Sequence, residues 1–146
     1  AIRRQRQMCI RDSWYMSYNG NPKSWYRVDR FLYRVPYEKT PEVYAACDIL
    51  LKTSLLESFS YPPLEMMASG GYVVAVPNGG NLEYLKDGEN CILYPQGNLA
   101  EAKAAIERIL TDAELRKKLD TGAEETVKER NWKRIEPQIL EQYLGK

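Results

Sequence analysis

Two glutamates, Glu57 and Glu65, bracket a short segment that contains a Pro–Pro pair. An apolar run at residues 47–52 precedes them and apolar residues follow at helical spacing, which predicts a buried strand, a loop and then a helix. Such a loop leaves the carboxyl end of a strand, and ligands bind at that end in open α/β sheets. A helix N-terminus offers free backbone N–H groups and a partial positive charge, so this corner suits a phosphate group.

The spacing allows both carboxylates to reach one crevice, because Glu57 falls in the loop and Glu65 about one turn into the helix. There they would hold hydroxyl groups at either end of a diphosphate. The two prolines lack N–H groups, so the amides of Ser60, Tyr61 and Leu64 and the Ser60 hydroxyl must act as donors. The same spacing also fits a simpler arrangement, in which Glu57 caps a loop and Glu65 is a solvated helix residue.

The remaining pattern predicts the elements that hold this corner. Strands are expected at residues 14–18, 29–35, 48–53, 72–76 and 91–94, with a turn at 19–22. The strand at 48–53 does not alternate, so we expect it at the centre of the sheet, covered on both faces. Helices are expected after Thr40 as N-cap, after the Pro–Pro pair, at 81–85 capped by Asn81, at 99–110, after Asp112 as N-cap, at 122–130 and at 132–143.

Composition limits the classes of protein that this chain can represent. It has 146 residues, 44% of them apolar, and a net charge of +1, so bulk electrostatics do not favour nucleic acid as a partner. No apolar run approaches the roughly 20 residues of a membrane span. The three cysteines have no metal-type spacing and are interpreted as free thiols of a reducing compartment. The absence of histidine excludes His-based catalytic triads.

Residues 1–13 carry four arginines and are left out of the fold assignment. They form either a basic surface arm or a non-native or disordered leader, and we favour the leader. The expected domains are therefore the leader at 1–13 and one α/β domain at 14–146. Because the chain begins with Ala, we expect a fragment of a longer protein.

Residues 48–95 resemble the nucleotide-sugar-binding half of retaining glycosyltransferases with the GT-B fold, of the glycosyltransferase family 4 type. The family motif has two glutamates separated by seven residues, and here it is Glu-Ser-Phe-Ser-Tyr-Pro-Pro-Leu-Glu-Met-Met-Ala-Ser-Gly at residues 57–70. The family continues with a Val-Val strand, a Gly-Gly turn, a glutamate and an Asp-Gly-x-Asn turn. These match residues 73–74, 79–80, 83 and 87–90.

The resemblance implies a fold and an activity. The fold is α/β, a Rossmann-like parallel sheet flanked by helices, equivalent to the C-terminal half of a GT-B enzyme and truncated at its N-terminal side. The full enzyme would move a sugar from a nucleotide-diphosphate sugar to an acceptor hydroxyl, with retention of configuration, in polysaccharide or glycoconjugate synthesis. No metal or cofactor is expected, because the helix dipole and basic residues neutralise the leaving diphosphate.

The resemblance also implies roles for particular residues. Glu57, the catalytic candidate, would contact hydroxyls of the donor sugar, and Glu65 would accept hydrogen bonds from the ribose. The nucleotide-base pocket would begin at Arg34, Val35 and Tyr37. The other donor-binding candidates are Ser58, Phe59, Ser60, Tyr61, Leu64, Gly79 and Gly80. The Gly79–Gly80 turn either approaches the donor sugar closely or is a simple turn.

Two departures from the family affect these expectations. Serines at 58 and 60 replace the usual glycines, so either the backbone lies further from the sugar or hydroxyls replace amides as donors. The family's Arg and Lys that meet the diphosphate have no counterpart here. We therefore expect the chain alone to bind donor weakly and to be inactive without the missing N-terminal half-domain.

The expected partners are a nucleotide-sugar donor, an acceptor glycan or glycolipid, and the missing N-terminal half-domain, with no nucleic acid and no membrane span. The expected location is the cytoplasm, and in the full-length enzyme the inner face of the membrane. Two alternatives remain. One is a non-catalytic α/β nucleotide-binding or regulatory module, such as a receiver-like domain. The other is a purely structural half-domain.

Overall fold

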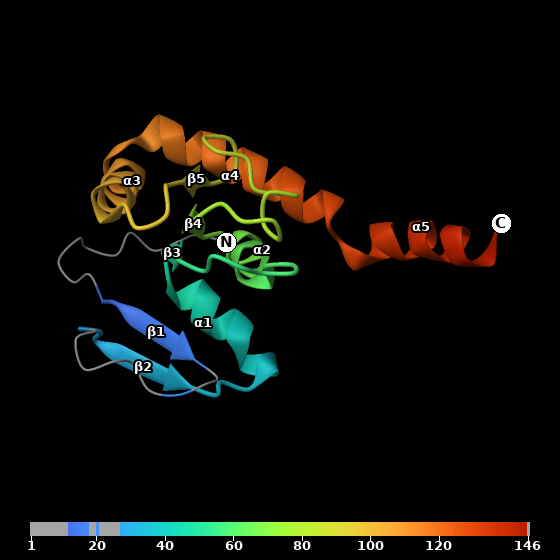
Figure 1. Ribbon diagram of the computed structural model, residues 1–146, viewed down its shortest axis with the longest axis horizontal. Coiled ribbons are helices and arrows are strands. Elements are labelled where there is room, and N and C mark those ends of the chain that lie inside the picture. The colour runs from blue at the N-terminus through green and yellow to red at the C-terminus, as the bar shows by residue number, and fades with distance from the viewer. Residues whose placement is uncertain (1–11, 18–19, 21–26, 146) are drawn as a thin grey trace. The chain divides into compact units, whose positions relative to one another are not determined.

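The computed structural model describes residues 12–17, 20 and 27–145 (Figure 1). The chain divides into two compact units, residues 1–40 and 41–146. Only Asp12 and Ser13 of the expected leader are described; the rest of it, and the turn at 19–22 apart from Gly20, lie outside the described residues. No described helix is both long and apolar enough to cross a membrane.

The first unit contains a pair of parallel strands, β1 (Trp14–Ser17) and β2 (Arg30–Tyr33), in the register Trp14 with Arg30. Ser13 fixes the start of this pair, because its N–H and its hydroxyl both donate to Asp29 Oδ2 at 2.7 Å. These bonds hold the pKa of the Asp29 carboxyl below its ordinary value. Both strands expected before residue 36 are therefore confirmed; β2 is shorter than predicted, and residue 18 of the other predicted strand lies outside the described residues.

A 3₁₀ turn, Tyr37–Lys39, leads directly into α1 (Thr40–Ala46). Thr40 was expected as the N-cap, but it has helical dihedral angles, and its hydroxyl donates back to the carbonyl of Pro36 at 3.4 Å. The N-cap prediction is wrong because the 3₁₀ turn already winds the chain before the helix starts.

The second unit is built on a three-stranded parallel sheet, in the order β3 (Ile49–Lys52), β4 (Tyr72–Ala75), β5 (Ile92–Leu93). β4 lies in the middle, with Val73, Val74 and Ala75 fully buried, whereas Leu51 of β3 is 45% exposed. The expectation that 48–53 forms the central, doubly covered strand is therefore wrong, because β3 has a strand neighbour on one side only within the described residues.

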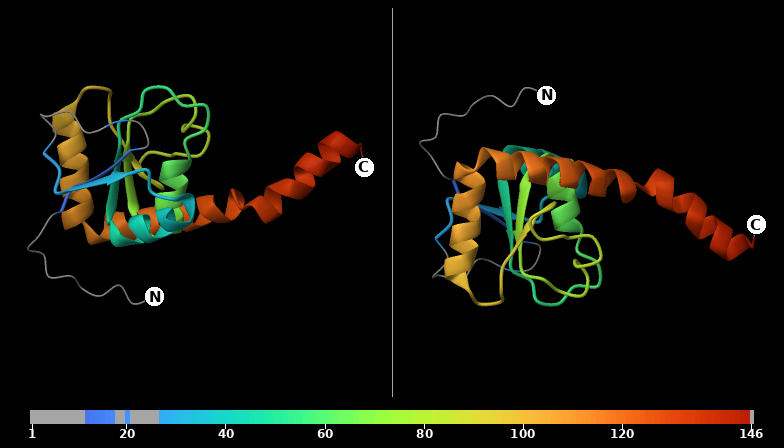
Figure 2. Two further views of the ribbon diagram at one scale, coloured as in Figure 1. Left: turned by 90° about the horizontal axis from the view of Figure 1, so that it is seen from below. Right: turned by 90° about the horizontal axis from the view of Figure 1, so that it is seen from above.

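Helices cover this sheet. α2 (Tyr61–Ala68) packs on β3, β4 and α4 (Ala113–Glu129), and α3 (Leu99–Thr111) packs on β4 and α4. Figure 2 shows β3 and β4 enclosed by these helices. Asn98 and Asp112 cap α3 and α4 through side-chain bonds to Glu101 N and Leu115 N. The core combines β4 and β5 with the apolar faces of α3 and α4: Val74, Val76, Ile92, Tyr94, Ala102, Ala105, Ile109 and Leu119.

Two predicted helices are not present as predicted. Residues 81–84 form turns, because the buried Asn81 side chain donates to the Val76 carbonyl and accepts from Asn78 N instead of capping a helix. Residues 122–129 continue α4 and do not form a separate helix. Gly122 lies inside α4, where an added Cβ would meet the Glu89 carbonyl oxygen at 2.3 Å, so this glycine serves close packing and does not end the helix.

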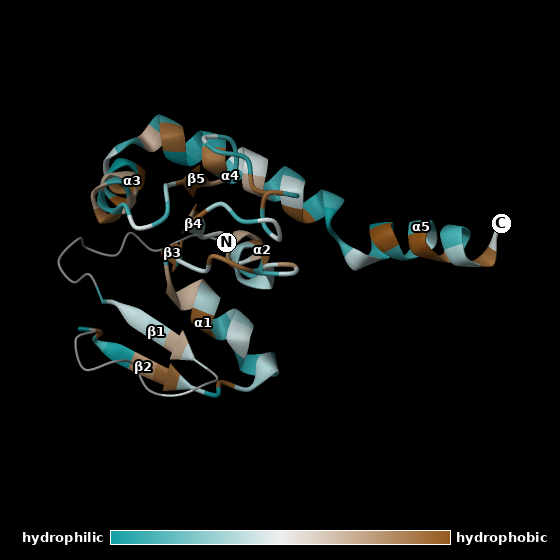
Figure 3. Ribbon diagram, viewed as in Figure 1, coloured by the Kyte–Doolittle hydropathy of each residue, from teal (hydrophilic) through white to brown (hydrophobic). Residues whose placement is uncertain are grey.

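The last helix, α5 (Trp132–Leu144), confirms the expected helix at 132–143 and buries none of its residues. Figure 3 shows apolar and polar residues interspersed along it. Together, the parallel strands and flanking helices confirm the α/β, Rossmann-like class expected from the sequence.

Candidate functional site

The predicted corner is present in the second unit. β3 ends at Lys52, residues 53–60 form a loop, and α2 begins at Tyr61. Glu57 lies in the loop, and its Oε1 accepts a hydrogen bond from Lys52 Nζ at 2.6 Å. That bond holds the pKa of the Glu57 carboxyl below its ordinary value, against the opposing effect of burial. The corner therefore carries an ionised carboxylate at neutral pH.

A second loop, residues 76–91, leaves the same end of the sheet from β4 and lies beside the first (Figure 2). Asn78 joins the two loops, since its Nδ2 donates to the Ser54 carbonyl at 2.9 Å. Gly80 permits a close approach of the two loops, because a Cβ at this position would lie 2.4 Å from the Glu57 carbonyl oxygen. The Gly79–Gly80 turn thus approaches the backbone of the glutamate loop, whereas Gly79 itself has open space around it.

Ser60 is the N-cap of α2 and is fully buried, but its side chain makes no capping bond. Its carbonyl accepts a hydrogen bond from the Tyr84 hydroxyl. Its own hydroxyl is the one buried side-chain oxygen or nitrogen in the described part of the chain that has no hydrogen-bond partner. A buried hydroxyl without a partner is costly, so this position has an unused donor beside a helix N-terminus.

The helix start leaves few amide donors. Tyr61 is the first helical residue, Pro62 and Pro63 have no N–H, and Leu64 is the first residue whose amide reaches back along a regular helix. The first turn of α2 contains no acidic side chain that would compete with an anion. The donors that remain are the amides of Ser60 and Tyr61 and the Ser60 hydroxyl.

Aromatic side chains pack behind the corner. Phe59 makes an edge contact with Tyr61, with ring centroids 4.9 Å apart, and a tilted contact with Tyr84 at 5.4 Å. Burial of the phenol raises the pKa of Tyr84 above its ordinary value, so it stays protonated as the donor to Ser60. These contacts hold the loop against the second loop.

The other predicted site residues fall in two places. Ser58 is exposed in the loop, and Leu64 and Glu65 are half-buried on α2. Arg34, Val35 and Tyr37 lie in the first unit, just after β2. Arg34 has a positive φ of 49°, and Tyr37 is 79% exposed. The structure thus brings Gly80 against the backbone of Glu57, and Ser60 ends the loop that contains Glu57.

Sequence reasoning missed three contributors to this corner. Lys52 was assigned only to the apolar strand, although a lysine at a strand end five residues before a loop glutamate is a usable signal. Asn78 and Tyr84 carried no such signal, because their partners are backbone carbonyls of Ser54 and Ser60, distant in sequence.

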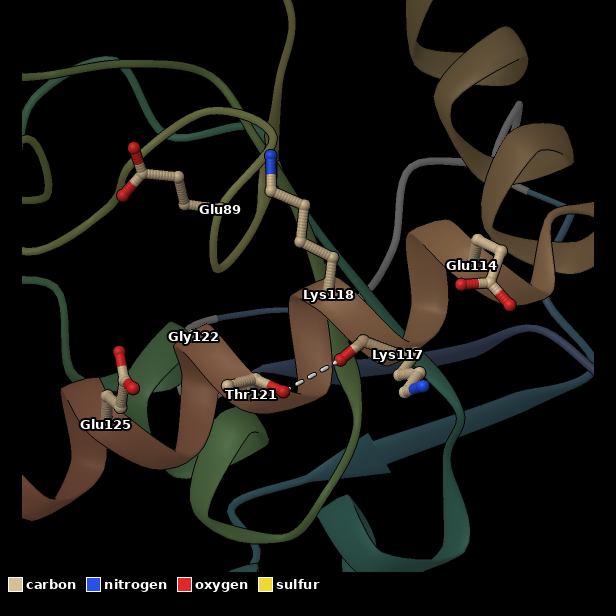
Figure 4. Close-up of a pocket in the computed structure, with 7 residues that line it drawn as sticks. All are labelled: Glu89, Glu114, Lys117, Lys118, Thr121, Gly122 and Glu125. Carbon is tan, nitrogen blue, oxygen red and sulfur yellow. Dashed lines mark hydrogen bonds between the residues drawn. The ribbon is translucent and has the colours of Figure 1, made fainter.

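A cavity of about 440 Å³ lies elsewhere, between the turn at Glu89 and α4. Figure 4 shows charged side chains around it, and no residue of the 57–70 motif lines it. Its lining consists of Glu89, Glu114, Lys117, Lys118, Thr121, Gly122 and Glu125.

Comparison with known proteins identifies relatives that match the region containing the corner. A family profile described as glycosyl transferases group 1 matches residues 29–126. The O-antigen biosynthesis protein RfbC of Myxococcus xanthus is 35% identical over 114 residues, which are 76% of this chain and 9% of that protein. A D-inositol 3-phosphate glycosyltransferase of Thermomonospora curvata is 30% identical over 116 residues, which are 80% of this chain and 27% of that protein.

Solved structures show the same architecture. Anabaena HepE in complex with UDP superposes with a TM-score of 0.71 at 28% identity, over 80% of this chain and 32% of that one. The same protein in complex with UDP-glucose gives a TM-score of 0.70. The chain spans a small part of the curated relatives it matches, 9% and 27% of the two named above. The match over residues 29–126 includes both glutamates and the two loops, and the chain therefore belongs to the glycosyl transferases group 1 family.

Proposed function

We propose that the chain is the donor-binding half of a retaining glycosyltransferase that moves a sugar from a nucleotide-diphosphate sugar to an acceptor hydroxyl. The observation that carries this proposal is the corner itself, in which a loop carboxylate and a helix N-terminus lie at the carboxyl ends of parallel strands. Complexes of the similar protein HepE with UDP and UDP-glucose support it. The name of one relative, the O-antigen biosynthesis protein RfbC, favours a role in cell-surface polysaccharide or glycoconjugate synthesis.

The proposal assigns each part of the corner a role in donor binding. The amides of Ser60 and Tyr61, with the partial positive charge of the helix N-terminus, receive the diphosphate without a metal. Glu65 accepts hydrogen bonds from the ribose hydroxyls, and Glu57 accepts them from the donor sugar. The missing N-terminal half-domain supplies the acceptor site and completes the transferase.

Titration of the ¹⁵N-labelled chain with UDP, UDP-glucose or glucose alone tests the proposal. We expect weak binding of the two nucleotides, with the largest amide shifts at Ser60, Tyr61 and Glu65, and none with glucose. Glu65→Ala should weaken UDP binding by about 5- to 150-fold, because a carboxylate–hydroxyl bond is worth about 1–3 kcal/mol.

Glu136→Ala is the matched control, because it removes an exposed carboxylate from α5. UDP binding with shifts away from the α2 N-terminus, or an unchanged affinity in Glu65→Ala, would contradict the assigned roles. Binding without any transfer in a longer protein that contains both halves would favour the non-catalytic module.

A further inference from the structure

The ion pair between Lys52 and Glu57 differs from the other lysine–glutamate pairs of the described chain. Lys52 Nζ and Glu57 Oε1 are 2.6 Å apart, and the side chains of Lys52 and Glu57 are only 17% and 27% exposed. The pair Lys103–Glu107 on α3 is 3.6 Å apart, with side chains 76% and 54% exposed. Exposed pairs of that kind do little to fix the conformations of their side chains. A short and partly buried pair, in contrast, restricts the conformations of both side chains.

Lys52 and Glu57 lie in different kinds of backbone structure. Lys52 is the last residue of β3, where it pairs with Ala75 and its carbonyl accepts from Val76 N at 3.0 Å. Glu57 belongs to a loop without regular secondary structure. The strand therefore fixes the lysine, and the lysine fixes the loop carboxylate. An ionised carboxylate has about four acceptor positions, so the bond to Lys52 and the smaller contribution of the Ser54 side chain leave capacity for ligand hydroxyls.

We propose that Lys52 is a positioning residue, which fixes the orientation of the Glu57 carboxylate for the hydroxyls of the donor sugar. This inference rests on the proposed function. Lys52 acts only through Glu57, so it affects the sugar moiety and not the nucleotide. The lowered pKa of Glu57 agrees with this role, because Lys52 is its largest cause and an ionised carboxylate is the better acceptor.

The test uses the 146-residue chain and two variants. Lys52→Met keeps the aliphatic stem but removes the charge, and Lys52→Arg restores a cation. Carboxyl-detected NMR titration follows the pKa of Glu57, and amide shifts give the affinities for UDP and UDP-glucose. We expect Lys52→Met to raise the pKa of Glu57 toward its ordinary value and to weaken UDP-glucose binding about tenfold. UDP binding should change less than about twofold, and Lys52→Arg should recover part of the loss.

Lys103→Met is the control, because it breaks an exposed pair on α3 and should alter neither readout. An unchanged pKa of Glu57 in Lys52→Met overturns the proposal, because the pair then does not exist in solution. Equal losses for UDP and UDP-glucose also overturn it, since Lys52 would then act on the nucleotide or on the fold. If the wild-type chain binds neither nucleotide, the proposed function fails, and the use of the pair for a donor sugar is overturned with it. The NMR titration still decides whether Lys52 controls the charge of Glu57.

Discussion

The unpartnered hydroxyl of Ser60 makes a quantitative prediction about stability. Ser60→Ala removes an oxygen that is fully buried and has neither a capping bond nor any other hydrogen-bond partner. Burying a hydroxyl without a partner costs about 1–3 kcal/mol. The usual loss on replacing an N-cap serine does not apply, because no bond to the helix is broken. The alanine variant should therefore be more stable by about 1 kcal/mol or more.

Urea denaturation followed by circular dichroism measures this change as a higher midpoint at unchanged slope. For a domain of this size, about 1 kcal/mol corresponds to a rise in Tm of about 3–5 °C. Ser58→Ala is the matched control, because that serine is exposed two residues earlier in the same loop and should change stability by less than about 0.5 kcal/mol.

A loss of stability in Ser60→Ala of about 1 kcal/mol would refute the reasoning, since the hydroxyl would then have a partner in solution. The same variant separates stability from function. If the hydroxyl donates to a bound diphosphate, Ser60→Ala should gain stability and lose UDP affinity, whereas a purely structural serine would leave the affinity unchanged.

Three further predictions concern the same region. Gly80→Ala should lower the free energy of unfolding, measured by urea denaturation, by about 1–3 kcal/mol, because the added Cβ would meet the Glu57 carbonyl oxygen at 2.4 Å. Gly79→Ala is the control, because open space surrounds Gly79, and it should change the free energy of unfolding little. Asn90→Ala should cost about 2–4 kcal/mol, since its amide makes three buried or part-buried bonds of 2.7–2.8 Å; a loss below 0.5 kcal/mol would contradict this. The pKa of Glu57 is lowered on folding, so the stability difference between wild type and Glu57→Gln should be complete above about pH 4.5 and should disappear as the pH falls further.

The sequence predicted the strand–loop–helix corner well, because its signals are local. The Pro–Pro pair fits the start of α2, and Gly70, with a φ of 74°, fits its end. Asp112 was equally readable as the start of α4. Each of these signals depends on residues within one helical turn.

The errors come from contacts that are distant in sequence. Asn81 looked like a helix cap, but its side chain is used by the Val76 carbonyl and the Asn78 amide. A separate helix was expected at 122–130, but α4 continues through Gly122, where the backbone at Glu89 packs closely. Glycine and asparagine permit several local structures, so tertiary packing decides among them.

The sequence pattern also did not predict that the strands form two sheets. One parallel sheet was expected, and the described strands form a two-stranded and a three-stranded sheet.

The contact between Gly80 and the Glu57 carbonyl has a consequence for protein engineering. Two connections meet through residues that are more than twenty positions apart in the sequence, so neither can be exchanged by itself. A chimera that imports residues 53–60 from a relative must also import residues 76–91, or the grafted segment will inherit a mismatched neighbour.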